Sequence, residues 1–316
     1  MAFFANLFGY VLNFIYNFVG NYGWAIIIFT IAVKVAMIPL SIKQQKNMKK
    51  NVETQAKMKE IQFKYKNDPE RLNQATMDLY KEEKINPLSG CFSVIIQLVL
   101  ILSVFYLVRS PLTHMKKIDS NVVNKYYTIM KQENMATSGG YPEIEIIREI
   151  DTLKSLDKEE INQEELNKMS INMEFLGLDL SQIPSKNTSD WRVFIIPVLY
   201  VIVSFISMKI SLVTQPGAKK NKEKLLNEDN KNPEPNPDDM MEAMEKANQN
   251  MSMMFPIMYL AVAIIAPLGL ALYWLVNSIL MILERLILNK FINDDKTGEV
   301  RRWQALFQKE KLLTKL

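Results

Sequence analysis

The sequence has few of the side chains on which most catalytic and metal sites depend. Among 316 residues it holds one cysteine, Cys91, and one histidine, His114. A single cysteine excludes a disulfide within the chain, and one Cys with one His does not supply the ligands of a conventional His/Cys metal site. The 10 glycines form no phosphate-binding loop and no nucleophile elbow. Nothing in the sequence therefore predicts an enzyme or a cofactor.

Charge is also missing from the start of the chain. Residues 1–33 carry no charged side chain, whereas residues 43–84 carry 11 Lys and Arg. Apolar blocks and charged blocks alternate in this way along the whole sequence. Such segregation is typical of a polytopic membrane protein rather than of a soluble core. The predicted fold class is an all-α polytopic membrane protein.

One cation interrupts the first strongly apolar run. Residues 23–40 are about long enough to cross a bilayer, since a span needs roughly 20 residues, and Lys34 lies within them. A lysine at the bilayer centre costs about 2.5–3.5 kcal/mol on insertion scales. Its side chain either bends toward the inner surface near Lys43 or faces a wet cavity lined by protein. We favour the cavity, because intramembrane ionisable residues usually mark function.

Residues 1–20 precede this run and have a different pattern. Apolar side chains recur at helical spacing from Phe3 to Phe18, with asparagines on another side. The stretch lacks the positive opening of a secretory signal. Residues 20–23 then break the run. We expect an amphipathic helix in the membrane interface; the alternative is an extension of the first span.

Four apolar blocks predict five transmembrane helices, because the last block accounts for two of them. The last apolar stretch, 251–288, is too long for one crossing, and residues 266–269 form a turn signal within it. Four spans are the alternative count. Lys and Arg mark cytoplasmic segments, so we expect the N-terminus outside and the C-terminus in the cytoplasm. The predicted segments are an interfacial helix at 1–20, span one at 21–42, a cytoplasmic helical hairpin at 43–87, span two at 88–108, an extracytoplasmic loop or subdomain at 109–191, span three at 192–213, a cytoplasmic linker at 214–250, spans four and five at 251–266 and 268–288, and a cytoplasmic basic tail at 289–316.

The hairpin is narrowly amphipathic and strongly charged. Asp68 is placed to cap its second helix, with Pro69 at the first helical position. The hairpin is either a basic loop that fixes topology or a docking surface for a substrate or partner. The basic tail suits contact with the phosphates of ribosomal RNA, but binding of anionic lipid or a role in topology is the simpler interpretation.

Four stretches resemble the YidC/Oxa/Alb family of membrane protein insertases. Residues 33–45, VKVAMIPLSIKQQ, resemble the family's first core span, and residues 64–91 resemble its cytoplasmic hairpin running into the next span. Residues 175–181, FLGLDLS, resemble the outer segment before its third span, and residues 267–277, PLGLALYWLVN, resemble the start of the last one. The family more often has arginine where Lys34 stands, and the outer loop is longer than we expect for the family.

The resemblance implies the five-span form of Gram-positive bacteria, with a hydrophilic groove open to the cytoplasm and to lipid. Such a protein inserts small membrane proteins into the bacterial cytoplasmic membrane, alone or beside the Sec translocon, without hydrolysing nucleotide. Lys34 corresponds to the positive groove residue, and 91–108 and 251–266 to the apolar slide. The implied partners are nascent membrane proteins and the lipid bilayer, then the Sec translocon and, through the hairpin and tail, the ribosome.

Lys34 would attract acidic segments of a substrate into the groove. Thr30 lies one turn away on the same helical face. For each of the other candidate residues, the alternative to a role in substrate binding is a hydrogen bond between helices. For the serines this alternative is the favoured interpretation. The rival functions are a small-solute transporter or channel, against which one central cation and no clear repeat argue, and an assembly factor that acts only with the Sec translocon. The remaining candidate groove residues are Gln97, Ser204, Ser207, Asn277 and Ser278.

Overall fold

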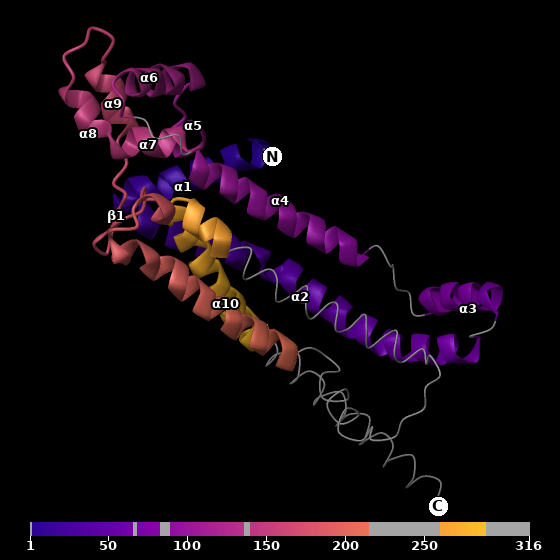
Figure 1. The fold of residues 1–316 in the computed structure, drawn as a ribbon. Helices are drawn as coiled ribbons and strands as arrows, with labels where there is room; N and C mark the ends of the chain where they lie inside the picture. The colour runs from indigo at the N-terminus through magenta and orange to yellow at the C-terminus, as the bar shows by residue number, and fades with distance from the viewer. Residues whose placement is uncertain (1, 66–67, 83–88, 136–139, 215–259, 289–316) are drawn as a thin grey trace, which may run out of the picture.

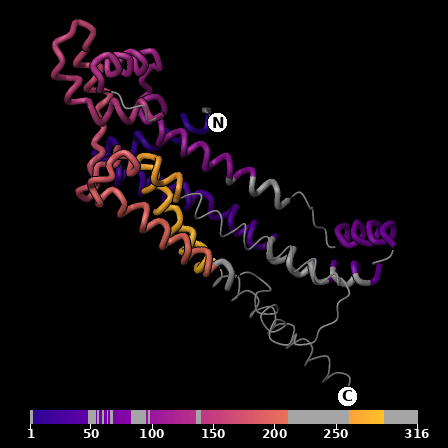
Figure 2. Tube along the Cα trace, viewed as in Figure 1, coloured from indigo at the N-terminus to yellow at the C-terminus, as the bar shows by residue number. Residues whose placement is uncertain are grey.

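The computed structural model describes residues 2–65, 68–82, 89–135, 140–214 and 260–288. Long helices run side by side, with a group of short helices at one end and α3 at the other (Figures 1 and 2). The predicted linker beyond Thr214, residues 251–259 of predicted span four, and the predicted tail lie outside the described residues.

The first two helices meet at a sharp turn. α1 (Ala2–Val19) ends at Gly20, whose φ of 67° lies in the left-handed region that glycine adopts without strain. Asn21 then caps α2 (Tyr22–Lys64), because its side chain accepts a hydrogen bond from the Trp24 amide at 3.2 Å. α2 is a single helix of 43 residues that continues through Pro39. Predicted span one and the first arm of the hairpin therefore belong to one helix.

The second arm of the hairpin is α3 (Pro69–Glu82), which folds back beside the end of α2 (Figure 1). Asp68 Oδ1 accepts a hydrogen bond from the Arg71 amide at 3.1 Å, so the predicted cap is confirmed. Leu79 is buried, and Thr76 Oγ1 donates to Met58 Sδ of α2 at 3.6 Å. Few buried side chains hold this arm in place.

Among the described residues, three helices are long and apolar enough to cross a membrane: Tyr22–Asn47, Trp191–Ile210 and Leu268–Leu288. They correspond to predicted spans one, three and five. α4 (Ser89–Arg109) and α10 (Ile195–Thr214) run alongside α2 (Figure 1). The protein is therefore helical and suited to a membrane, while the count of five spans stays a prediction.

The described residues between 109 and 191 fold into a small subdomain at one end of the bundle, which we call the outer subdomain after its predicted side of the membrane. It is mainly helical and includes a two-stranded antiparallel hairpin that pairs Glu174 with Asp179. Buried side chains such as Tyr126, Met130 and Leu166 form its interior. Its elements are α5 (Pro111–His114), α6 (Ser120–Gln132), α7 (Pro142–Arg148), α8 (Ile150–Ser155), α9 (Gln163–Met169), β1 (Glu174–Phe175), β2 (Leu178–Asp179), and the short 3-10 helices Pro184–Lys186 and Trp191–Phe194.

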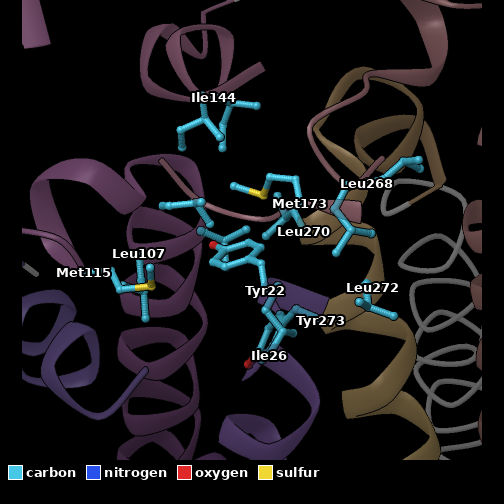
Figure 3. Close-up of a cluster of buried hydrophobic side chains, with 14 of the residues drawn as sticks. Tyr22, Ile26, Leu107, Met115, Ile144, Met173, Leu268, Leu270, Leu272 and Tyr273 are labelled. Atoms are coloured by element: carbon cyan, nitrogen blue, oxygen red, sulfur yellow. The ribbon is translucent and has the colours of Figure 1, made fainter. Parts of the chain in front are cut away.

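The largest apolar core lies where this subdomain meets the long helices. Tyr22 and Ile26 of α2 lie beside Leu268 and Tyr273 of the last helix, with Met173 nearby (Figure 3). Close packing of these side chains fixes the ends of the helices relative to one another. The halves of the same helices that lie away from the outer subdomain carry fewer buried side chains among the described residues.

Candidate functional site

Lys34 forms an ion pair with a residue of the last helix. Its Nζ lies 3.3 Å from Glu284 Oε2, and each of the two side chains is 19% exposed. The pair joins α2 to the helix Leu268–Leu288, the first and last of the three apolar helices. A pair so little exposed is weakly screened, and removing either partner would leave the other charge in apolar surroundings.

Sequence reasoning missed Glu284. It predicted one central cation and searched for no partner. Glu284 is a carboxylate inside an apolar helix of 21 residues. The search for charges within apolar runs that singled out Lys34 would also have found it. Arg285 follows directly, so Glu284 and Arg285 together resemble the charged residues that commonly end a helix.

The hydroxyl groups of two other candidates bond within their own helices. Thr30 is buried, and its Oγ1 donates to the Ile26 carbonyl of the same helix at 2.6 Å. Ser204 Oγ donates to the Val201 carbonyl of α10 at 2.9 Å. For Ser204 this is not the interhelical bond considered from the sequence. It is the local back-bonding that Ser and Thr often make in helices.

Three of the remaining predicted residues lie on the last helix and on α10. Asn277 is half-buried and lies seven residues before Glu284, hence on the same face of the helix. Ser278 is buried on that helix, and Ser207 is half-buried on α10. Among the side chains that the structure places, no hydrogen bond joins Lys34 to another predicted candidate. The side chain of Gln97 lies outside the described part of the structure.

The outer end of the bundle is tied together by main-chain bonds. The carbonyls of Leu180 and Gln182 accept hydrogen bonds from the Gly269 and Leu268 amides, each at 2.9 Å. These amides open the last helix and have no partner within it. At the other side of the same segment, the Asn172 carbonyl accepts from the Tyr22 amide at 3.0 Å. Residues 172–182 thus connect the start of α2 to the start of the last helix.

An aromatic side chain of β1 packs against α2 at the same place. A Cβ added at Gly23 would lie 2.3 Å from Phe175 Cδ2, so only glycine allows this approach. The Trp24 and Phe175 rings meet edge to face with centroids 5.4 Å apart. These contacts add a packed layer at the start of α2, about three turns before Lys34.

Comparison with known proteins shows which family the sequence resembles. The sequence profile of the family described as 60Kd inner membrane protein matches residues 14–296. Over 110 residues the chain is 42% identical to the membrane protein insertase YidC of Caldanaerobacter subterraneus subsp. tengcongensis, covering 35% of this chain and 53% of that protein. Over 114 residues it is 41% identical to the YidC of Fusobacterium nucleatum, covering 35% of this chain and 56% of the relative.

Other relatives are longer. The YidC of Polynucleobacter asymbioticus is 42% identical over 101 residues, which are 32% of this chain and 18% of that protein. The matched segment thus spans between about a fifth and somewhat more than half of these relatives. Because the profile covers most of the chain, from residue 14 to residue 296, this protein belongs to the 60Kd inner membrane protein family, the YidC/Oxa/Alb family.

Proposed function

We propose that this chain is a membrane protein insertase of a bacterial cytoplasmic membrane, with Lys34 and Glu284 at the charged centre of its groove. The observation that carries the proposal is their ion pair, which joins two helices apolar enough to span a bilayer. Charged side chains are rarely kept at such positions without a functional reason. The relatives named membrane protein insertase give the activity.

The arrangement of charge along the bundle supports the proposed orientation. α3 lies at the end of the bundle opposite the outer subdomain (Figure 1). Residues 43–84, which include α3, carry 11 Lys and Arg, and such segments stay in the cytoplasm. In this orientation residues 109–191 face outward, and the N-terminus lies outside. The packed layer at residues 172–182 then closes the groove on the outer side.

An insertase must shorten the path of polar groups through hydrocarbon. Each unsatisfied polar group costs several kcal/mol there, so a wet groove that reaches part of the way across lowers the barrier. A positive charge acts more strongly at low dielectric than in bulk water. Lys34 therefore favours substrates whose translocated tail or loop carries carboxylates.

Because Lys34 is already paired with Glu284, a substrate carboxylate binds Lys34 by replacing Glu284 as its partner. Before a substrate arrives, Glu284 neutralises Lys34 at 3.3 Å. A bare lysine in the same place would be costly, whereas a substrate carboxylate that replaces Glu284 keeps the lysine paired throughout. The exchange discriminates against tails without a carboxylate, because such tails cannot compensate for the lost pair. It needs no covalent step and no nucleotide.

The apolar part of the substrate leaves along the slide formed by 91–108 and 251–266. On α4, the described part of this slide presents exposed apolar side chains, and burial of the substrate in lipid drives the step. Thr30, Gln97, Ser204, Ser207, Asn277 and Ser278 are proposed to line the groove. We also propose the Sec translocon and the ribosome as partners. The exposed residues on α4 are Ile95, Leu98 and Tyr106.

Reconstitution of the purified chain into protein-free liposomes tests the activity. A single-span substrate with an acidic tail is added, and protease protection of the tail is measured against empty liposomes. We expect protection that depends on the protein. Absence of protection with every substrate tried would contradict autonomous insertion and would favour an assembly factor that needs the Sec translocon.

A further inference from the structure

α1 leaves an apolar stripe exposed. Phe14 is 76% exposed and Phe18 is 88% exposed, and Phe3, Leu7 and Tyr10 lie along the same side of the helix. The opposite side is buried against α4 and α2. In the part of the chain that the structure describes, nothing covers this stripe. A helix with one such face is suited to the boundary between headgroups and acyl chains.

The outer subdomain docks on α1 beside that stripe. A Cβ added at Gly9 would lie 1.9 Å from the main-chain oxygen of His114, so the end of α5 rests directly on the backbone of α1. Two and three residues further on, Lys116 and Lys117 place their ammonium groups over tyrosine rings of α1. The distance from Nζ to the ring centroid is 4.5 Å for Lys116 on Tyr16 and 4.1 Å for Lys117 on Tyr10.

Hydrogen bonds fix Lys117 in this position. Its Nζ donates to the main-chain oxygen of Asn6 at 3.1 Å and to Asn6 Oδ1 at 3.2 Å. Tyr10, under the same ammonium group, is 65% exposed and belongs to the apolar stripe. The two cations therefore stand at the edge of the surface that we assign to the lipid boundary.

These lysines lack the acidic partners found elsewhere in the subdomain. Lys125, Lys158, Lys168 and Lys186 each pair with a glutamate. Within the described residues, no carboxylate pairs with Lys116 or Lys117, and burial lowers the pKa of both. A bound anion would reverse that effect by favouring the charged form.

His114 lies at the same junction. Its Nδ1 lies 3.1 Å from Asn6 Oδ1. Burial, together with the nearby charge of Lys117, lowers the pKa of His114 below its usual value. Both effects disfavour a charged imidazole, whereas the two lysines supply positive charge at this junction.

We propose that Lys116 and Lys117 bind the headgroup phosphate of an anionic phospholipid in the outer leaflet, with its acyl chains along the exposed stripe of α1. Basic side chains near a membrane surface attract anionic lipid headgroups. The apolar stripe of α1 offers a surface for acyl chains, which a free phosphate does not have. The lipid would fasten the outer subdomain and α1 to the membrane surface. This site is separate from the groove, so it goes beyond the proposed insertase activity.

Photocrosslinking with lipids tests the site on the full-length chain. The protein is reconstituted into phosphatidylcholine vesicles with a trace of photoreactive phosphatidylglycerol or photoreactive phosphatidylcholine, and crosslinked peptides are mapped. We expect phosphatidylglycerol to crosslink to α1 and the end of α5 in preference to phosphatidylcholine. The double variant Lys116→Gln/Lys117→Gln should lower that preference by about tenfold or more, since each lysine contributes separately. Crosslinks on the basic cytoplasmic segment should not change and serve as the internal standard.

Two further variants make the result specific. Lys116→Arg/Lys117→Arg keeps both charges and should keep the preference. Lys154→Gln/Lys168→Gln removes two charges from α8 and α9 of the same subdomain and should also keep it. Equal phosphatidylglycerol preference at α1 in the wild type and in Lys116→Gln/Lys117→Gln would overturn the proposal. So would crosslinks in the wild type that avoid α1 and α5.

Discussion

Lys34 and Glu284 lie 250 positions apart in the chain and form an ion pair with Nζ and Oε2 3.3 Å apart. The two side chains are equally exposed, so water reaches both charges to the same extent. A lysine that stands alone within its apolar run in the sequence is thus paired with a carboxylate of the last helix. The attraction of Lys34 for a substrate has to be measured against its attraction for Glu284.

Breaking the pair from one side should destabilise the protein more than removing it completely. Lys34→Met leaves a carboxylate unpaired and Glu284→Leu leaves an ammonium group unpaired, each at a cost of about 1–3 kcal/mol, somewhat below that of a fully buried pair. The double variant carries neither charge. We expect the thermal midpoint in detergent to be higher in the double variant than in at least one single variant. Strictly additive losses would mean that the two residues are not coupled.

Glu284→Gln should speed the insertion of acidic substrates. Without the competing carboxylate, Lys34 is available to the substrate from the start. The initial rate of protease protection should rise about threefold to tenfold, which corresponds to roughly 1 kcal/mol in the barrier. Glu284→Asp keeps the charge and serves as the matched control. A slower rate in Glu284→Gln than in Glu284→Asp, at equal amounts of folded protein, would contradict the exchange of partners.

Glycines at the two close approaches should not tolerate a methyl group. Gly23→Ala forces its Cβ into the Phe175 ring, and Gly9→Ala forces it into the main chain at His114. Overpacking of this kind costs about 1–3 kcal/mol, and we expect a lower thermal midpoint for both variants. Gly23→Ala should be partly rescued by Phe175→Ala, since a side chain is the obstacle there.

Gly20→Ala provides the comparison for this series. Gly20 has a φ of 67°, but no atom lies within 4 Å of its added Cβ. Only backbone strain of roughly 1 kcal/mol is then expected. If Gly20→Ala lowered the thermal midpoint as much as Gly9→Ala, the contact between α1 and α5 would not be the tight one described here.

The outer subdomain should lose stability as pH rises because of Glu143. Its buried carboxylate accepts hydrogen bonds from the amide of Thr113 at 3.0 Å and from Thr113 Oγ1 at 2.6 Å. Burial raises its pKa above the ordinary 4.5, and the bonds from Thr113 oppose that shift only in part. The folded state therefore holds a proton that the unfolded state releases, so stability falls as pH rises from about 4.5 through the raised pKa.

Glu143→Gln should remove this pH dependence, because the amide does not titrate yet still accepts a bond from Thr113. Glu143→Ala should lower stability at every pH by about 1–3 kcal/mol, since the Thr113 amide loses its acceptor. Hydrogen exchange of the α5 and α7 amides across the acid range measures both effects. A wild-type profile that matches the slope of Glu143→Gln would contradict the assignment.

The sequence was most informative where one residue broke an otherwise uniform pattern. Lys34 stood out because it lies in an apolar run, and Asp68 because it precedes a proline at a helix start. Both predictions rest on local rules. The pairing of Lys34 with Glu284 depends on how two helices far apart in the sequence pack, and the periodicity of either helix does not predict it. Glu284 also lies near a helix end, where charged residues are common.

The outer subdomain was the least predictable part. Its helices α5, α7, α8 and α9 have between 4 and 7 residues, too few for a helical period to show one apolar face. The contact of Gly9 with the end of α5 was hidden for another reason. A small residue in an apolar helix predicts nothing by itself, and its role depends on a segment that follows about a hundred residues later.

The most direct test compares two substrates that differ only in charge. Each has the same apolar span, and the translocated tail carries either carboxylates or the matching amides. In liposomes, wild-type protein and Lys34→Arg should insert the acidic substrate, and Lys34→Ala should insert it at least about tenfold more slowly. The amide substrate should show little difference among the three proteins. Equal insertion of the acidic substrate by the wild type and Lys34→Ala would contradict a groove that works through the charge of Lys34.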